Sequence, residues 1–232
     1  MFIFIPFAFG GNPASESGPR AVYDYFTKKN IDGIKHSIIF EQTLYESAYQ
    51  YMLRINKEIS LILKNKKKNI IIGGNHLSLM PIYQLCYARQ ANILTLDAHR
   101  DYYPQDKLNH ATFLKYISGC CKSHFLVGYR DTDQHNQIHP NITALKNFKH
   151  NIINTKIDYL DIDIDVLDPY IFPWCGSAID NGMSLIELMK MVDFFSTSGC
   201  NLLSISEYIP NYDMHEKGLE IIYQIVSNFL IK

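Results

Sequence analysis

Short runs of apolar residues, each about as long as a β-strand, recur along this chain and are separated by stretches with helical patterning. The apolar runs lie at residues 2–6, 36–40, 69–72, 92–96, 124–127, 151–154 (the weakest), 158–164 and 202–205. The helical stretches lie at about residues 18–30, 43–64, 79–89, 184–195 and 214–230, and a further helix is expected to begin near His110. Apolar strands that alternate with helices predict an α/β fold, a three-layer α/β/α arrangement around a mostly parallel sheet of about eight strands.

Polar side chains stand at the ends of several predicted strands. They are Asn75 and His76 after the third run, Asp97, His99 and Asp101 after the fourth, Asp131 and Asp133 after the fifth, Asp163 and Asp165 at the seventh, and Glu207 after the eighth. The carboxyl ends of parallel strands meet at one edge of the sheet, where ligands of such folds bind. We therefore expect a functional site at this edge.

Composition sets the broad class. The chain has 232 residues, of which 47% are hydrophobic and 19% charged, and its net charge is −1 at pH 7. No internal repeat or linker interrupts it, so we expect one domain over residues 1–232. The densest basic segment, residues 64–68, is typical of a solvated helix end, and we expect no nucleic-acid partner.

Cysteine usage and the N-terminal residues bear on location. The five cysteines form no CxxC pair, and their odd number argues against a disulfide framework. This favours a reducing, cytoplasmic setting. Residues 1–9 are apolar, but they lack a signal-peptide pattern and are too short to span a bilayer. We expect them to form a buried first strand, with no membrane partner.

The spacing of the acids and histidines indicates a metal site. Asp97 and His99 are two positions apart, so on an extended strand they point to the same face, as do Asp161, Asp163 and Asp165. Three carboxylates on one face repel one another unless a cation compensates; the alternative is that these acids end the strand and face solvent. A mixed set of carboxylate and imidazole ligands is more typical of a Mn²⁺ site than of a zinc site with thiolate ligands. Two divalent ions ~3.5–4 Å apart can share a water molecule and lower its pKa.

Four segments, in order, resemble motifs of the ureohydrolases, the family of arginase and agmatinase. Residues 73–78 (GGNHLS) resemble the GGDHS motif, residues 97–101 (DAHRD) the DAHxD motif, and residues 161–169 with Pro173 the SxDxDxxDPxxxP motif; Gly18, Pro19 and Arg20 resemble the N-terminal GPxxxR region. The resemblance implies an arginase-like fold and hydrolysis of a guanidine to urea and an amine. It also implies two Mn²⁺ ions held by His76, Asp97, His99, Asp101, Asp163 and Asp165.

The same resemblance suggests roles for three further residues. His110 would be catalytic and pass a proton to the leaving amine; the alternative is a histidine that caps a helix. Glu207, in a segment like the family's ExxP, would be catalytic and bind the guanidinium group; the alternative is a strand-end acid paired with a surface lysine. Asp133, in a segment like the GxRDxD of arginases, would contact the substrate.

The chain also departs from the family pattern. Asn75 replaces an aspartate, Asp161 replaces a serine, and residues 102–109 are shorter than the arginase loop that grips the free amino acid. A shorter loop should leave a wider mouth. We therefore expect an arginase-type enzyme, a short atypical form resembling peptide arginases, whose substrate extends to arginine side chains in a peptide.

Other interpretations remain open from the sequence. Within the family they are an agmatinase or a guanidinobutyrase acting on a small free guanidine. A protein of the histone-deacetylase-like group would use one zinc ion, which the presence of both His76 and Asp101 argues against. A degenerate binding protein on the same fold would lack a ligand residue, and none is missing. The sequence leaves the number of subunits open.

Overall fold

A single parallel sheet carries the fold. The computed structural model describes residues 1–63, 67–117, 119, 121–131, 140–146 and 150–231. Its strands are β1 (Phe2–Ile5), β2 (Ile38–Ile39), β3 (Asn69–Gly73), β4 (Asn92–Leu96), β5 (Ser123–Val127), β6 (Ile142–Leu145), β7 (Tyr159–Asp163) and β8 (Leu202–Ser206). They pair in the order β2-β1-β3-β8-β7-β4-β5-β6, and every pairing is parallel. The predicted fold class is confirmed.

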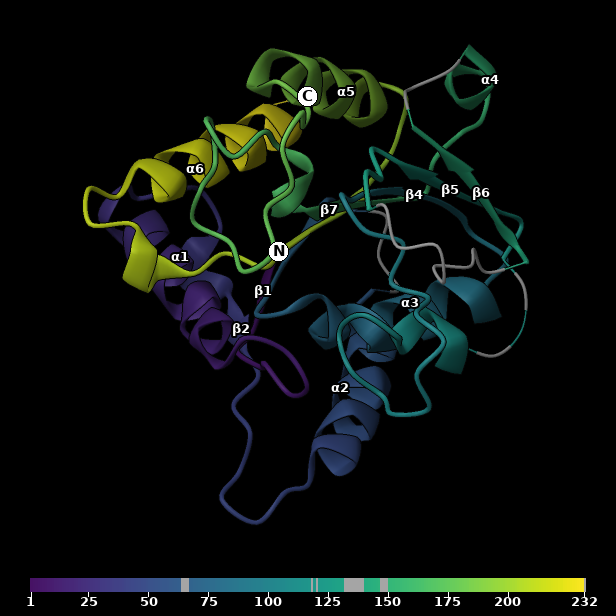
Figure 1. Cartoon of the computed structure of the whole chain (residues 1–232). Coiled ribbons are helices and arrows are strands. Elements are labelled where there is room, and N and C mark those ends of the chain that lie inside the picture. Colours follow the sequence, from purple (N-terminus) through teal and green to yellow (C-terminus); the bar gives the residue numbers. More distant parts are fainter. Residues whose placement is uncertain (64–66, 118, 120, 132–139, 147–149, 232) are drawn as a thin grey trace.

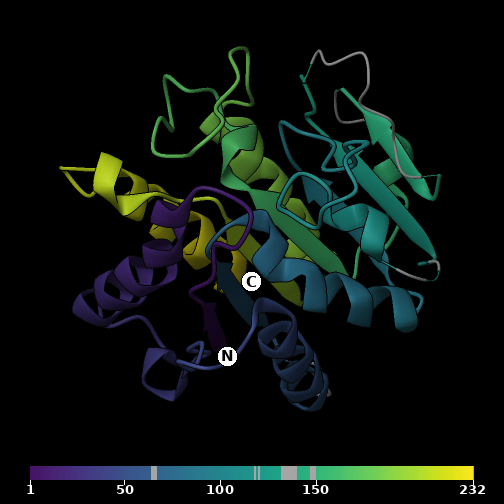
Figure 2. The ribbon, with the colours of Figure 1, turned by 60° about the horizontal axis from the view of Figure 1, so that its bottom comes forward.

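Helices cover both faces of the sheet (Figures 1 and 2). The helices α1 (Gly18–Lys28), α5 (Leu185–Thr197) and α6 (Lys217–Leu230) share one buried apolar cluster with the sheet, and α2 (Ala48–Ile62) and α3 (Met80–Ala88) share the other. The central strands are buried on both faces, which explains their continuous apolar runs. None of the helices in the described part of the chain is long and apolar enough to cross a membrane.

Local sequence signals set where two of the helices begin. Ser47 caps α2 and Ser184 caps α5, and in both cases the residue at the third helical position, Gln50 or Glu187, returns a bond to the cap backbone. Such a capping box satisfies two backbone N–H groups that the helix leaves unpaired. The box also explains why α2 begins at Ala48, whereas the apolar pattern predicts a start at residue 43.

Two predicted elements are wrong. Residues 151–154 do not form a strand: the helix α4 (His150–Ile153) covers most of them, and the sixth strand is Ile142–Leu145, paired with β5. A short apolar run does not distinguish strand from helix by its pattern alone. The helix expected near His110 is only a 3-10 turn at Phe113–Tyr116, because the Thr112 hydroxyl accepts from the Asn109 amide and donates to Lys107 O.

The loop after β3 lies close to the segment that follows β1. A Cβ on Gly74 would collide with the backbone oxygen of Phe7, so only glycine fits at this position. The loop is also bonded to the segment after β8, since the Glu207 amide donates to Gly74 O at 2.7 Å. Segments from three strands are thereby held together at the carboxyl edge of the sheet.

Candidate active site

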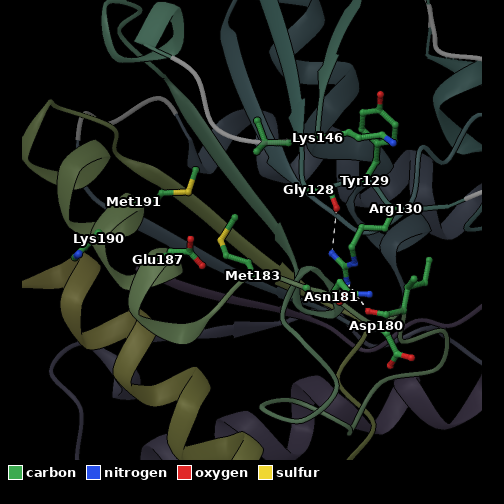
Figure 3. Close-up of a pocket in the computed structure, with 13 residues that line it drawn as sticks. Gly128, Tyr129, Arg130, Lys146, Asp180, Asn181, Met183, Glu187, Lys190 and Met191 are labelled. Atoms are coloured by element: carbon green, nitrogen blue, oxygen red, sulfur yellow. Dashed lines mark hydrogen bonds between the residues drawn. The ribbon is translucent and has the colours of Figure 1, made fainter.

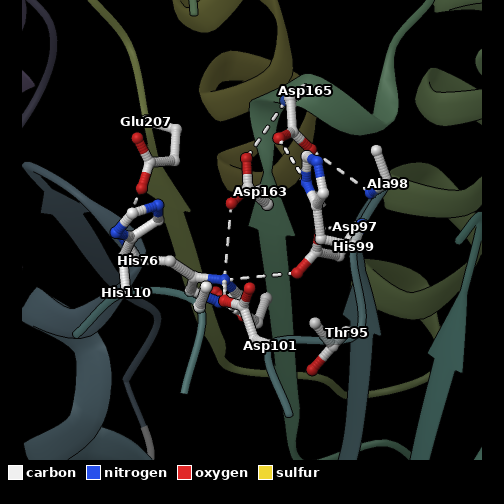
Figure 4. A network of polar contacts seen from close by, with 12 residues as sticks. His76, Thr95, Asp97, Ala98, His99, Asp101, His110, Asp163, Asp165 and Glu207 are labelled. Atoms are coloured by element: carbon white, nitrogen blue, oxygen red, sulfur yellow. Dashed lines mark hydrogen bonds and ion pairs between the residues drawn. The ribbon is translucent and has the colours of Figure 1, made fainter. Parts of the chain in front are cut away.

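The acids and histidines singled out from the sequence meet at the carboxyl edge of the sheet (Figure 4). His76 begins a 3-10 turn after β3, Asp97 follows β4, Asp163 is the last residue of β7, and Asp165 lies in the 3-10 turn after it. All four side chains are buried. Burial excludes the alternative that the acids of β7 face solvent, because Asp163 is only 3% exposed.

One group of ligand atoms surrounds the Nδ1 atom of His76. The nearest carboxylate oxygens are those of Asp101 at 2.8 Å, Asp97 at 3.3 Å and Asp163 at 3.4 Å. The backbone at Asp101 has φ 44°, a left-handed conformation that is uncommon for a residue other than glycine. The turn after β4 thus brings Asp101 back toward the strand that it left.

A second group lies beside the first and shares Asp97 with it. His99 Nδ1 is 2.9 Å from Asp165 Oδ2 and 3.7 Å from Asp97 Oδ1. Backbone amides fix these acids: Ala98 donates to Asp165 Oδ1 at 3.2 Å, and His99 donates to Asp97 Oδ1 at 2.6 Å. The two groups of ligand atoms therefore lie side by side.

The acids raise the pKa values of both imidazoles. Burial by itself lowers the pKa of His76, but Asp161 and Asp101 outweigh it and raise that pKa well above the ordinary value. Burial is likewise outweighed at His99, where Asp165 raises the pKa to about 12. The positive charge that a metal would bring is supplied in the metal-free chain by protons.

The acids shift one another in both directions. Burial and the neighbouring Asp97 raise the pKa of Asp101 to about 6, and burial together with Asp165 and Asp97 raises the pKa of Asp163 well above its ordinary value. Burial acts in the same sense on Asp97, but the adjacent imidazoles of His76 and His99 keep its pKa below the ordinary value. Like charges packed together and out of water produce this division of pKa values, and a divalent cation would relieve it.

The arrangement fits two metal ions. His76 Nδ1 is buried without a hydrogen-bond partner in the described part of the chain, although three carboxylate oxygens approach it. Two sets of ligand atoms, each within 4.8 Å of one another, are His76, Asp97 and Asp163, and Asp97, His99 and Asp165. Asp97 belongs to both sets, so it would serve as a ligand in each. An oxygen and nitrogen donor set of this kind suits Mn²⁺ and similar ions.

A cavity of about 140 Å³ opens beside these ligands, with His110 and Glu207 in its wall. Glu207 is 7% exposed, has φ 68°, and its Oε1 accepts from the His76 amide at 2.8 Å. Burial raises the pKa of Glu207 to about 7. The Nδ1 atom of His110 lies 2.6 Å from Gly10 O, to which it donates, so the other ring nitrogen is left for a ligand.

Asp133 lies outside the described residues. Two described residues of that segment, Arg130 and Asp131, are bonded to other parts of the site. Arg100 Nε donates to Asp131 Oδ1 at 2.8 Å, and Arg130 donates to the backbone oxygens of Asp165 and Val166. On the far side of Arg130 is a hollow of about 840 Å³, which Figure 3 shows with Met183 and Met191 on its wall. None of the candidate metal ligands lines this hollow, so it lies outside the candidate active site.

Several residues at the site have no signal in the sequence. Tyr103 and Ser177 line the cavity, and neither lies in a motif or at a strand end. Asp161 is visible in the sequence as an additional acid, but the alternation of β7 does not show that it contacts the far side of the His76 ring, where its Oδ2 is 2.8 Å from Nε2. This contact depends on how α3 and the loop after β3 pack on the sheet.

The sheet is wholly parallel, and acids and imidazoles gather at its carboxyl edge in the grouping that metal ligands adopt. These features place the protein in the class of α/β proteins with a candidate binuclear metal centre. The model of the arginase family matches residues 12–231. The chain therefore belongs to the arginase family, a family of hydrolases that act on amidino C–N bonds.

Individual relatives are distant in sequence and close in fold. A protein named agmatinase from Halalkalibacterium halodurans is 23% identical over 235 residues, which cover 88% of this chain and 81% of the relative. The crystal structure of the agmatine ureohydrolase of Thermoplasma volcanium has a TM-score of 0.81 at 18% identity, covering 99% of this chain and 87% of that one. Arginase from Bacillus subtilis gives 0.77 at 16% identity, covering 100% and 98%.

Proposed function

We propose that this protein is a ureohydrolase that depends on two divalent metal ions and releases urea from a small guanidine compound. The observation that carries the proposal is the convergence of six candidate ligand residues at one edge of the sheet. Four of them, His99, Asp101, Asp163 and Asp165, line a cavity together with the buried carboxylate of Glu207. Membership of the arginase family supports the reaction class. The set of candidate ligands is complete, which argues against a degenerate binding protein.

The proposed metal ligands are His76, Asp97, His99, Asp101, Asp163 and Asp165, with Asp97 shared between the two ions. Two divalent cations at such a site activate a water molecule as the nucleophile. The charges agree with this assignment, because the four negative charges of the aspartates match the positive charge of two divalent cations. Mn²⁺ is the ion we propose, since the ligands are oxygens and imidazole nitrogens.

The residues of the cavity bind the substrate and handle its protons. Glu207, when ionised, pairs with the planar guanidinium group in a charge-assisted hydrogen bond. His110 is fixed by Gly10 O and supplies its other ring nitrogen to protonate the leaving amine. Both side chains line the cavity beside the proposed ligands Asp163 and Asp165.

Agmatine is the first substrate to test. Seven relatives by sequence carry the name agmatinase, and the cavity of about 140 Å³ is of a size for a compact guanidine. The arginase-type activity predicted from the GxRDxD segment is the second candidate, favoured by the fold shared with Bacillus subtilis arginase. The arginine-containing peptide is the third substrate of the panel.

The test is a measurement of urea release by the purified chain loaded with Mn²⁺ and given agmatine, arginine or an arginine-containing peptide. We expect urea from agmatine at the highest kcat/KM and none after treatment with EDTA. The variant Asp97→Asn, which alters the ligand common to both metal sets, should lose activity together with the metal. If the chain binds two Mn²⁺ ions and releases urea from no guanidine, the proposal is wrong.

A further inference from the structure

Asp161 lies below the candidate metal centre, in the middle of the sheet. It is 0% exposed and stands directly opposite Thr95 of β4 and Ser204 of β8. Its carboxylate accepts hydrogen bonds from the hydroxyls of Tyr83 and Ser204, and its Oδ2 is 2.8 Å from His76 Nε2. Three donors thus surround one buried carboxylate, a number that an ionised acid can accept.

The hydrogens of the neighbouring groups all point toward Asp161. The hydroxyl hydrogen of Tyr83 is used by Asp161, so Thr95 Oγ1, at 2.6 Å, must donate to Tyr83. His124 Nε2, 2.9 Å from Thr95 Oγ1, must then donate to Thr95. The other ring nitrogen, His124 Nδ1, lies 3.0 Å from the Tyr87 hydroxyl. The hydrogen bonds that lead from His124 through Thr95 and Tyr83 to Asp161 therefore run in one direction.

A second chain ends on the other oxygen of the same carboxylate. Ser204 donates to Asp161 Oδ1, so the Tyr159 hydroxyl, 2.7 Å away, donates to Ser204. Chains of hydrogen bonds that run in one direction polarise one another and strengthen the last bond. Asp161 is consequently held as an acceptor on all sides, and the imidazole of His76 must present an N–H at Nε2.

The orientation of His76 decides whether it can bind a cation. Its Nδ1 atom faces the carboxylates of Asp97, Asp101 and Asp163 at 2.8–3.4 Å. A neutral imidazole with no partner at Nε2 would place its hydrogen on Nδ1, toward those oxygens, and would then have no lone pair for a metal. A carboxylate that accepts the Nε2 hydrogen fixes the opposite tautomer, with the lone pair on Nδ1. It also makes Nδ1 a stronger electron-pair donor to a metal.

Resting on the proposed function, we propose that Asp161 is a positioning residue that holds His76 in its metal-binding tautomer and selectively tightens the ion bound by His76, Asp97 and Asp163. A serine, the residue expected here from the resemblance, brings no charge and can donate as well as accept. Among the described residues, neither His99 nor Asp165, which would hold the second ion, contacts this network. The effect is therefore confined to one of the two ions.

The experiment is a titration of the metal-stripped chain with Mn²⁺, followed by calorimetry and by competition with a chromophoric chelator. The variants are Asp161→Ser and Asp161→Asn, with Tyr83→Phe as a milder change that keeps the carboxylate and removes one donor to it. Tyr25→Phe is the matched control, because it removes a tyrosine hydroxyl bonded to Glu220, a residue of α6.

We expect the wild-type chain to bind two equivalents. In Asp161→Ser and Asp161→Asn the dissociation constant of one equivalent should rise about 10–100-fold while the other changes little. The electron paramagnetic resonance spectrum at low Mn²⁺ should shift from coupled pairs of ions toward single ions. Tyr83→Phe should weaken the same equivalent to a smaller degree, and Tyr25→Phe should match the wild type.

The outcomes separate the two proposals. A wild-type chain that binds fewer than two equivalents contradicts the proposed function and removes the basis of this inference. Two equivalents in the wild type, unchanged or equally weakened in both Asp161 variants, overturn the role of Asp161 alone. If circular dichroism shows that neither Asp161 variant folds, Tyr83→Phe decides: unchanged binding of both equivalents overturns the inference.

Discussion

At the scale of single residues, His110 and Glu207 reach the cavity from different segments of the chain, and a backbone group orients each of them. His110 precedes a short 3-10 turn where the sequence led us to expect a helix, and its ring is oriented by Gly10 O. Glu207 comes from the end of β8 and is oriented by the His76 amide. The sequence left open a surface lysine as the partner of Glu207. The carboxylate is instead oriented by the backbone N–H of His76, a proposed metal ligand.

His110→Asn should lower kcat about 10²–10⁴-fold with little change in KM, because the amide can still donate to Gly10 O while the second ring nitrogen is lost. Steady-state urea release measures both constants. His215→Asn, at an exposed position, is the control and should match the wild type. A wild-type kcat in His110→Asn would remove the proton-transfer role.

Glu207→Gln should lower kcat/KM about 30–1000-fold, since losing one partner of a buried charge pair costs about 2–4 kcal/mol. The glutamine oxygen can still accept from the His76 amide, so metal binding should persist. Measuring the inhibition constants of a guanidine and of a neutral analogue of the same shape checks the cause: only the guanidine should bind more weakly. Glu58→Gln, on the exposed surface of α2, serves as the control. Equal weakening of both inhibitors would contradict a pairing with the guanidinium group.

At the scale of elements, glycines at the ends of strands allow the loops of the site to approach one another. Gly128 has φ 102°, and a Cβ there would lie 2.7 Å from Val166 Cγ2 and 3.3 Å from Asp97 O. Gly74 touches the backbone of Phe7 in the same way. The motif glycines therefore set the distances between the segments that carry the ligands.

Gly74→Ala should reduce the free energy of unfolding by about 1–3 kcal/mol, because the added methyl group collides with the backbone of Phe7 and displaces the loop. Mn²⁺ affinity should fall in parallel, since His76 lies on the same loop. Urea denaturation and metal titration measure the two effects. Gly176→Ala is the matched control, as its Cβ would meet nothing closer than 3.5 Å. Equal stabilities of the two variants would show that the loop yields without cost.

At the scale of the whole molecule, the buried charges link folding to metal and protons. In the metal-free chain the pKa values of Asp101, Asp163 and Glu207 are raised, as are those of His76 and His99. From about pH 6 to pH 8 the folded chain therefore binds more protons than the unfolded chain. Under that condition the free energy of unfolding falls as the pH rises.

The EDTA-treated chain should consequently be more stable at about pH 6 than at about pH 8, by about 1.4 kcal/mol per pH unit for each extra proton held. Saturating Mn²⁺ should reverse the trend, because protons compete with the metal for its ligands. Urea denaturation at both pH values, with and without Mn²⁺, checks the sign. A metal-free chain that gains stability toward pH 8 would contradict the proton uptake by the cluster.

Much of the fold was predictable because local physics determines it. A parallel strand buried on both faces must be apolar, so the runs at β1, β3, β4, β7 and β8 are visible in the sequence. The edge strand β6 is not, because its half-exposed Ile-Thr-Ala-Leu has no such requirement. The run at residues 151–154 then competes with it on composition alone, and the pairing with β5 decides.

The sequence by itself determined which residues are the candidate metal ligands and at which edge of the sheet they stand, since strand polarity and alternation follow from the backbone. Only the tertiary structure decided how deep each acid lies. Asp161 and Asp163 share a face of β7, but two residues of extended chain separate them by about 6–7 Å. Asp163 therefore reaches Nδ1 of His76 and Asp161 reaches Nε2, on opposite sides of one ring. The packing of α3 and of the loop after β3, which sets the position of that ring, depends on contacts between distant residues that no local pattern contains.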